Sequence, residues 1–94
     1  MNPSYYFIIN PASLKADKKT AAHIAAFFEN REEKIEVAYW TIEQTVSSLV
    51  EKAQAAGFST IVACGGDGTI REVGKALIGT SLEIGILPWG LGME

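Results

Sequence analysis

Cysteine, positive charge and long apolar runs are all scarce in this chain. The single cysteine, Cys64, excludes an intramolecular disulfide. Lysine and arginine together number 8, against 11 aspartate and glutamate residues, and the formal net charge is −3. Domains that bind nucleic acids carry clustered basic residues, so we expect no nucleic-acid partner.

Two further absences concern membranes and metals. No apolar run approaches the ~20 residues that a membrane-spanning helix needs, and the first residues lack the basic region of a secretory signal. We therefore expect a cytoplasmic chain without a transmembrane segment. The only histidine, His23, has no neighbouring cysteine or second histidine with which to share a metal ion, so no metal ligands are assigned.

What the chain does contain suits one small globular domain. It has 94 residues, of which 48% are hydrophobic and 20% charged, values that are ordinary for a folded protein. A chain of this length has room for one hydrophobic core and not for two. We interpret residues 1–94 as a single domain.

Apolar segments of two kinds alternate along the chain. Short β-rich runs predict strands, and the spacing of apolar residues between them predicts helices. Ala21, Ile24, Ala25 and Phe28 form one helical face, and Val46, Leu49, Val50 and Ala53 form another. The predicted strands cover residues 5–9, 35–40, 60–64 and 84–87, and the predicted helices lie around residues 21–28, 41–56 and 70–77.

The boundaries of the second helix carry recognisable signals. Thr41 followed by Gln44 has capping-box spacing, so we expect Thr41 to open this helix. Gly57 stands where a left-handed cap favours glycine. The order strand, helix, strand, helix, strand, helix, strand predicts an α/β fold, an open parallel sheet with helices on both faces.

Open parallel sheets bind ligands at the carboxyl ends of their strands. The Asn10-Pro11 turn and the turn Gly65-Gly66-Asp67-Gly68-Thr69 both follow predicted strands. Glycines allow close approach of a ligand, and free N–H groups at a helix start favour a phosphate. Asp67 would repel phosphate unless a Mg²⁺ ion lay between them or the carboxylate handled a proton.

A purely structural interpretation of the glycine turn remains open. It could be a strand-to-helix connection with Asp67 or Thr69 as the N-cap, although Thr69 could equally donate to a phosphate oxygen. The turn is not a Walker A loop, and Arg71 stands where the third glycine of the dinucleotide-binding fingerprint would fall. Cys64, just before the turn, is interpreted as a buried core residue.

The run from Gly65 to Val73 resembles the signature of the diacylglycerol kinase catalytic domain family, which includes sphingosine, ceramide and bacterial lipid kinases. Three further segments resemble that family in order and spacing. They are the turn after the first strand, the residue Thr41, and residues 84–90. The resemblance implies a Rossmann-like fold of the NAD kinase and diacylglycerol kinase type. It also implies that the chain is a truncated, nucleotide-binding part without the family's β-rich second domain.

The family's functional residues can be carried over position by position. The resemblance implies that ATP and Mg²⁺ are the cofactors, with Asp67 in the Mg²⁺ and water network or near the acceptor hydroxyl as the catalytic residue, and with Glu72 near the nucleoside. A lipid acceptor is expected only in a complete enzyme, and this chain alone is expected to be incomplete. The residues implied to line the nucleotide are Asn10, Pro11, Ala12, Ser13, Leu14, Thr41, Gly65, Gly66, Asp67, Gly68, Thr69, Ile70, Arg71 and Glu72.

The chain also departs from the family pattern. Leu14 stands where the family usually has glycine, and Arg71 where it often has asparagine. In the late loop Leu91, Met93 and Glu94 replace a threonine, an asparagine and an aspartate. The lost hydroxyl and amide groups lower the expected nucleotide affinity.

Three alternatives stay open from the sequence. NAD kinase-like and phosphofructokinase-like domains share a Gly-Gly-Asp-Gly turn, and a non-catalytic association domain would explain the apolar residues of the late loop.

Trp40 and Trp89 could stack on an adenine or simply pack. Because Trp89, Leu91 and Met93 are apolar and close together, we expect a homo-oligomer, most simply a twofold dimer.

Overall fold

The computed structural model describes residues 3–11 and 18–88, without the side chains of residues 18–21 and 88. Within this part a four-stranded parallel sheet has the strand order β2-β1-β3-β4. The elements in chain order are β1 (Ser4–Ile9), α1 (Lys18–Phe27), β2 (Lys34–Tyr39), α2 (Val46–Ala55), β3 (Thr60–Gly65), α3 (Asp67–Leu77) and β4 (Glu83–Pro88).

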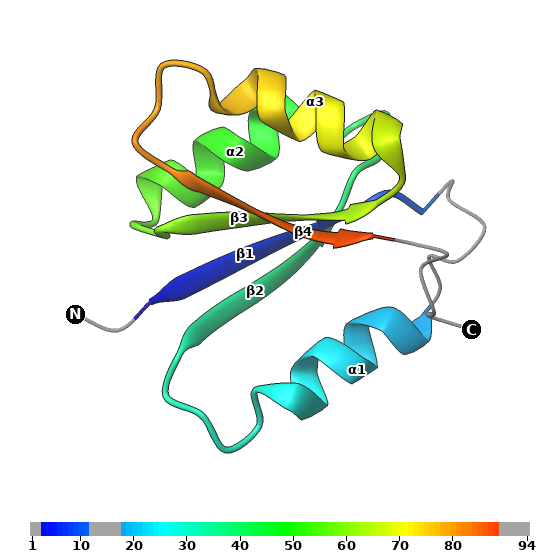
Figure 1. The fold of residues 1–94 in the computed structure, drawn as a ribbon, viewed down its shortest axis with the longest axis vertical. Helices are drawn as coiled ribbons and strands as arrows, with labels where there is room; N and C mark the ends of the chain where they lie inside the picture. Colours follow the sequence, from blue (N-terminus) through cyan, green and yellow to red (C-terminus); the bar gives the residue numbers. More distant parts are fainter. Residues whose placement is uncertain (1–2, 12–17, 89–94) are drawn as a thin grey trace.

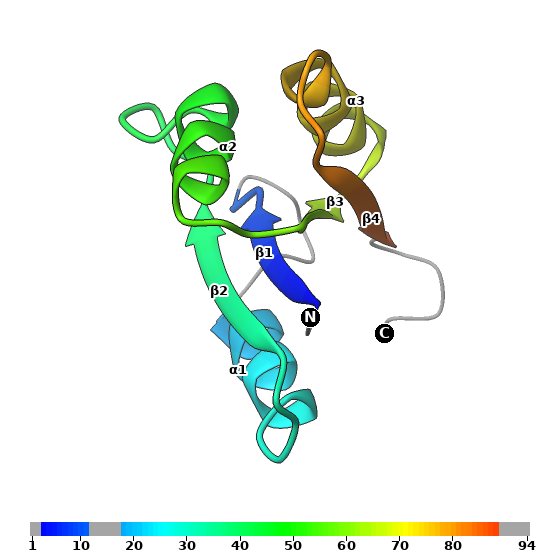
Figure 2. The ribbon, with the colours of Figure 1, turned by 90° about the vertical axis from the view of Figure 1, so that its left-hand side faces the viewer.

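Helices cover both faces of the sheet, as the sequence predicts. Helices α2 and α3 lie side by side over one face and α1 lies beneath the other (Figure 1). The view turned by 90° shows the same three layers, with the strands between the helices (Figure 2). The predicted α/β class, with an open parallel sheet, is therefore confirmed.

The two faces of the central strand β1 build two separate cores. Successive side chains of a strand point to opposite faces, so Tyr6 and Ile8 pack beneath α2 and α3, while Phe7 and Ile9 pack towards α1. All four side chains are buried. This burial explains why β1 is apolar without alternation, as is typical of an inner parallel strand.

Among the residues that the structure describes, the α2–α3 core is the larger of the two. The predicted inner face of α2 is confirmed, since each of its four residues is buried. The same core takes in Ile61 and Ala63 from β3 and Val73 and Leu77 from α3. On the α1 side Ile24 is buried and Phe28 is half-buried, whereas Ala25, which the pattern placed on the same helical face, is exposed. Among the described side chains of α1, Ile24 is the one that is buried against the sheet.

The start of α2 differs from the prediction. The helix begins at Val46, and its N-cap is Thr45, whose side chain accepts a hydrogen bond from the Ser48 backbone N–H. Thr41 instead closes a separate turn before the helix, in which its Oγ1 accepts from the Gln44 N–H at 2.9 Å. Both Thr41 and Thr45 accept a hydrogen bond from the residue three positions on. Only Thr45, which directly precedes the apolar face of α2, caps the helix.

The glycines that end α2 and α3 behave as the pattern indicates. Gly57 and Gly79 have φ angles of +83° and +85°, a left-handed conformation that other residues rarely adopt. No helix within residues 3–11 and 18–88 is long and apolar enough to cross a membrane.

Candidate functional site

The carboxyl ends of the strands bring distant segments together at one edge of the sheet. Ile9 lies opposite Cys64 in the β1–β3 register, and the next residue, Asn10, donates its backbone N–H to the Cys64 carbonyl at 3.3 Å. Trp40, just after β2, donates its N–H to the Ile9 carbonyl at 2.8 Å. The Asn10-Pro11 turn therefore lies between the β2–α2 loop and the glycine turn.

A side-chain hydrogen bond joins the Asn10-Pro11 turn to the glycine turn. The Asn10 Nδ2 donates to the Thr69 Oγ1 at 3.1 Å. Thr69 is in the first turn of α3 and only 2% of it is exposed, whereas Asn10 is half-buried. Two of the predicted site segments, 59 positions apart in the chain, are thus in direct contact.

The packing around Thr69 accounts for the first glycine of the turn. A Cβ placed on Gly65 would lie 2.6 Å from the Thr69 Oγ1 and 2.9 Å from the Thr69 Cβ. Both distances are shorter than carbon contacts allow. Gly65 is therefore required by the protein's own packing, in addition to any role with a ligand.

The next two glycines have a different environment. A Cβ on Gly66 or on Gly68 would meet no other atom within 4 Å, and both residues are exposed, as is Asp67 between them. Neither residue has a positive φ. Nothing in the described structure requires glycine at these two positions, so the space in front of them is open to a ligand.

Helix α3 begins directly in this turn. Its N-cap is Gly66, with no side-chain hydrogen bond to the cap, so neither Asp67 nor Thr69 is the N-cap. The first intrahelical bond runs from the Ile70 N–H to the Gly66 carbonyl at 3.1 Å. The N–H groups of the three residues before Ile70 have no acceptor within the helix, and the helix dipole favours negative charge there.

A groove opens beside this turn, at the carboxyl ends of β1 and β2. Its volume is about 430 Å³, and it is lined by Asn10, Pro11, Trp40, Thr41, Ile42 and Thr45. The sequence interpretation named the first four of these residues. It missed Ile42, which is 96% exposed, and the N-cap Thr45.

The turn that carries Ile42 is held by several hydrogen bonds. Besides the bond to the Thr41 Oγ1, the Gln44 carbonyl accepts from the Thr41 N–H at 3.0 Å. The Gln44 side chain donates to the Tyr39 carbonyl and accepts from the Lys52 Nζ. An ordered turn therefore presents an exposed isoleucine at the mouth of the groove.

The remaining predicted residues of α3 lie further from the edge. Ile70 packs against the α2–α3 core, and Arg71 is exposed. Glu72 is ion-paired with Lys75, with 3.1 Å between Oε1 and Nζ. The predicted residues Ala12, Ser13 and Leu14 lie outside the described part of the chain, as do Trp89, Leu91, Met93 and Glu94.

Two ionisable side chains lie near this edge, the Cys64 thiol and the Asp67 carboxylate. Cys64 is buried, as expected, and burial raises the pKa of its thiol to about 12, so it is neutral and unreactive at physiological pH. Among the described residues no group of three or more His, Cys, Asp or Glu is placed to hold a metal ion. A single exposed carboxylate, Asp67, is present at the turn.

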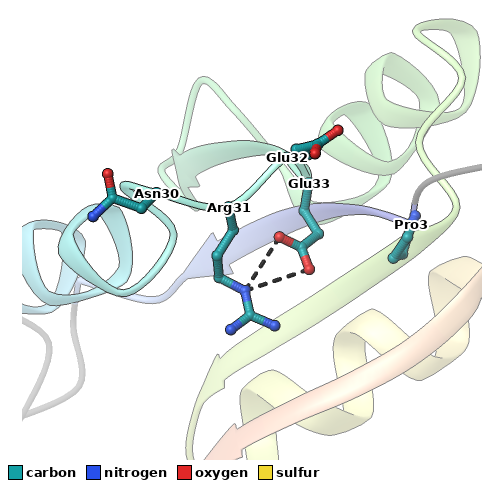
Figure 3. A pocket seen from close by; sticks show the side chains of 5 residues that line it. All are labelled: Pro3, Asn30, Arg31, Glu32 and Glu33. Atoms are coloured by element: carbon teal, nitrogen blue, oxygen red, sulfur yellow. Dashed lines mark hydrogen bonds and ion pairs between the residues drawn. The ribbon is translucent and has the colours of Figure 1, made fainter.

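A second hollow lies at the opposite, amino-terminal edge of the sheet (Figure 3). Its volume is about 380 Å³, and its lining is Pro3, Asn30, Arg31, Glu32 and Glu33. The Arg31 Nε donates to both carboxylate oxygens of Glu33, at 3.2 and 3.4 Å. Two acidic residues against one arginine do not favour a phosphate, and no predicted site residue lies here.

Comparison with known proteins gives a consistent result. A "Probable lipid kinase YegS-like" of Pseudomonas aeruginosa is 57% identical over 44 residues, which are 45% of this chain and 15% of that protein. A protein of the same description from Cronobacter sakazakii is 33% identical over 89 residues, covering 90% of this chain and 29% of that protein. The chain thus spans less than a third of the length of these relatives. Residues 4–92 match the model of the diacylglycerol kinase catalytic domain, and the chain belongs to this family.

Proposed function

We propose that residues 1–94 form the nucleotide-binding domain of a lipid kinase. In the complete enzyme, the γ-phosphate of ATP would be transferred to a lipid hydroxyl. One observation carries the proposal. The Asn10–Thr69 hydrogen bond joins the turn after β1 to the open glycine turn after β3, which gathers the expected nucleotide contacts at the edge where parallel sheets bind ligands.

The phosphate groups would bind at the start of α3. The backbone N–H groups of Asp67, Gly68 and Thr69 have no intrahelical acceptor there, and the open space at Gly66 and Gly68 admits a large anion. The Asp67 carboxylate would repel that anion on its own. It fits a Mg²⁺ ion bound by one carboxylate and by phosphate oxygens, a frequent arrangement for this metal.

The nucleoside would bind in the neighbouring groove. Trp40 and Ile42 offer apolar surface for a base, and the turn of Thr41 offers polar groups at the same place. The family resemblance also implies that Glu72 would lie near the nucleoside. Because Glu72 is paired with Lys75, that exposed ion pair would open when Glu72 contacts a ribose hydroxyl, at a small cost.

The lipid acceptor follows from the relatives' description as lipid kinases. The match to the diacylglycerol kinase model also favours a lipid kinase over the NAD kinase-like alternative. Phosphoryl transfer is catalysed mainly by positioning and by neutralising charge. This chain would supply the donor side of that arrangement.

Isothermal titration with ATP, with and without Mg²⁺, tests the proposal. We expect weak, Mg²⁺-dependent binding that Gly66→Val abolishes, because the added side chain fills the space of the phosphates without touching the rest of the protein. Gly74→Val is the matched control, since a Cβ there also meets no atom within 4 Å but the residue lies in the middle of α3. Equal binding by wild type and Gly66→Val, or sub-micromolar affinity without metal, would contradict the proposal.

A second candidate function, association with a second copy, is favoured by strand β4. Ile84 and Ile86 are 43% and 52% exposed, and β4 pairs only with β3 among the described strands. An edge strand with exposed apolar side chains is a site for pairing with another chain. Light scattering over a concentration series tests this, and a mass of one chain throughout would exclude it.

A further inference from the structure

We propose that the Thr69 side chain has a positioning role, in which its hydroxyl acts on the nucleotide only through Asn10. The hydroxyl would hold the Asn10 amide at the boundary between the glycine turn and the groove. This inference rests on the function proposed above and assigns the Thr69 hydroxyl a role other than contact with phosphate.

The burial of Thr69 argues against direct contact with a ligand through its side chain. Only 2% of the residue is exposed, while Gly66, Asp67 and Gly68 in the same turn are all exposed. A ligand at the exposed side of this turn meets the backbone of the turn and not the Thr69 hydroxyl. The partner that the hydroxyl oxygen does have is the Asn10 amide, at 3.1 Å.

The fit of Gly65 against Thr69 shows that the hydroxyl is held in place. The Thr69 Oγ1 lies only 2.6 Å from the position that a Cβ of residue 65 would take. Thr69 is buried and lies close against Gly65. Its hydroxyl is therefore a fixed hydrogen-bonding partner that holds the Asn10 side chain in one place.

Asn10, by contrast, is in a position to contact a ligand. It is half-buried, and it lines the groove together with Thr41 and Trp40. The bond to Thr69 holds the Asn10 side-chain amide beside the start of α3, and so fixes where that amide lies at the edge of the groove.

A double-mutant cycle tests the inference. We expect Thr69→Val, which keeps the shape and removes the hydroxyl, to weaken binding of Mg²⁺–ATP by about tenfold, the usual value of one lost hydrogen bond. Thr69→Ser should bind within about twofold of wild type. In an Asn10→Ala background, Thr69→Val should cause no further loss, since the residue through which it acts is gone.

Nuclear magnetic resonance of the free protein distinguishes a positioning role of Thr69 from a general contribution to stability, because it reports on the Asn10 side chain directly. The side-chain amide resonances of Asn10 should shift in Thr69→Val and stay near their wild-type positions in Thr69→Ser. If Thr69→Val does not fold, Thr69→Ala and Thr69→Ser form a substitute pair that differs by one oxygen atom. Unchanged Asn10 resonances in the variant without the hydroxyl would overturn the inference.

The possible failures are distinguishable. If the wild-type chain binds no Mg²⁺–ATP, the proposed function fails, while the resonances of the free protein still decide whether Thr69 orients Asn10. If the wild type binds and Thr69→Val binds equally well, the function stands and the positioning role is refuted. Additive losses in the double mutant would show that Thr69 acts independently of Asn10 and would also refute it.

Discussion

Replacement of Gly65 by alanine should destabilise the domain strongly. The new Cβ would lie 2.6 and 2.9 Å from the Thr69 Oγ1 and Cβ, and Thr69 cannot move aside because it is buried at the base of α3. Overpacking of this kind costs about 1–3 kcal/mol. The φ angle of +157° adds strain for a residue with a Cβ, so we expect a loss of about 2–4 kcal/mol in the free energy of unfolding.

The companion substitution, Gly68→Ala, adds the same atoms three residues later and should have the opposite effect. It meets no neighbouring atom and lies within α3, where alanine stabilises a helix by about 0.5–1 kcal/mol relative to glycine. In a domain of this size 1 kcal/mol shifts the melting temperature by about 4–8 °C. Thermal unfolding followed by circular dichroism should therefore place Gly65→Ala roughly 10–25 °C below wild type, with Gly68→Ala slightly above it. A melting temperature for Gly65→Ala within about 3 °C of wild type would refute the packing argument.

Three further predictions concern stability, capping and association. Burial raises the pKa of the Cys64 thiol to about 12 from its ordinary value of 9.0. The stability that this burial contributes is therefore complete below pH 9 and is lost as the pH rises towards 12, at up to about 1.4 kcal/mol per pH unit. Urea unfolding at pH 7.5 and 10.5 should show a smaller loss of stability at the higher pH for Cys64→Ala than for wild type. Thr45→Ala should accelerate hydrogen exchange of the Ser48 amide and cost about 1 kcal/mol, whereas Thr41→Ala should accelerate exchange of the Gln44 amide alone; the reverse pattern would restore Thr41 as the cap. Ile86→Lys should lower any dimer mass in light scattering, since charge on an edge strand opposes pairing, and Trp89→Ser tests whether the late loop also takes part.

The sequence by itself determined the architecture. Unbroken apolar runs in β1 and β3 indicated strands with both faces covered, and helical spacing between the strands supplied the covering elements. The inner face of α2 and the glycine at its end followed from the same reasoning. The motif around Gly66 and its similarity to a known family then indicated where to look for a ligand.

The tertiary structure decided which residues of those segments meet. Two threonines near α2 had capping spacing, and only the three-dimensional path of the chain distinguished Thr45 at the helix from Thr41 in the preceding turn. The exposure of Ala25 beside the buried Ile24 depended on how α1 packs on the sheet. Local patterns describe what a residue can do, and packing selects among those possibilities.

The glycine turn shows the same division most clearly. The sequence did not distinguish its three glycines, and Thr69 could cap the helix or donate to a phosphate oxygen. In the folded chain Gly65 makes room for the Thr69 hydroxyl, Gly66 and Gly68 leave open space, and Thr69 bonds to Asn10 from a different strand. No local pattern carries that information, because a contact between residues 59 positions apart exists only once the sheet has aligned the ends of β1 and β3.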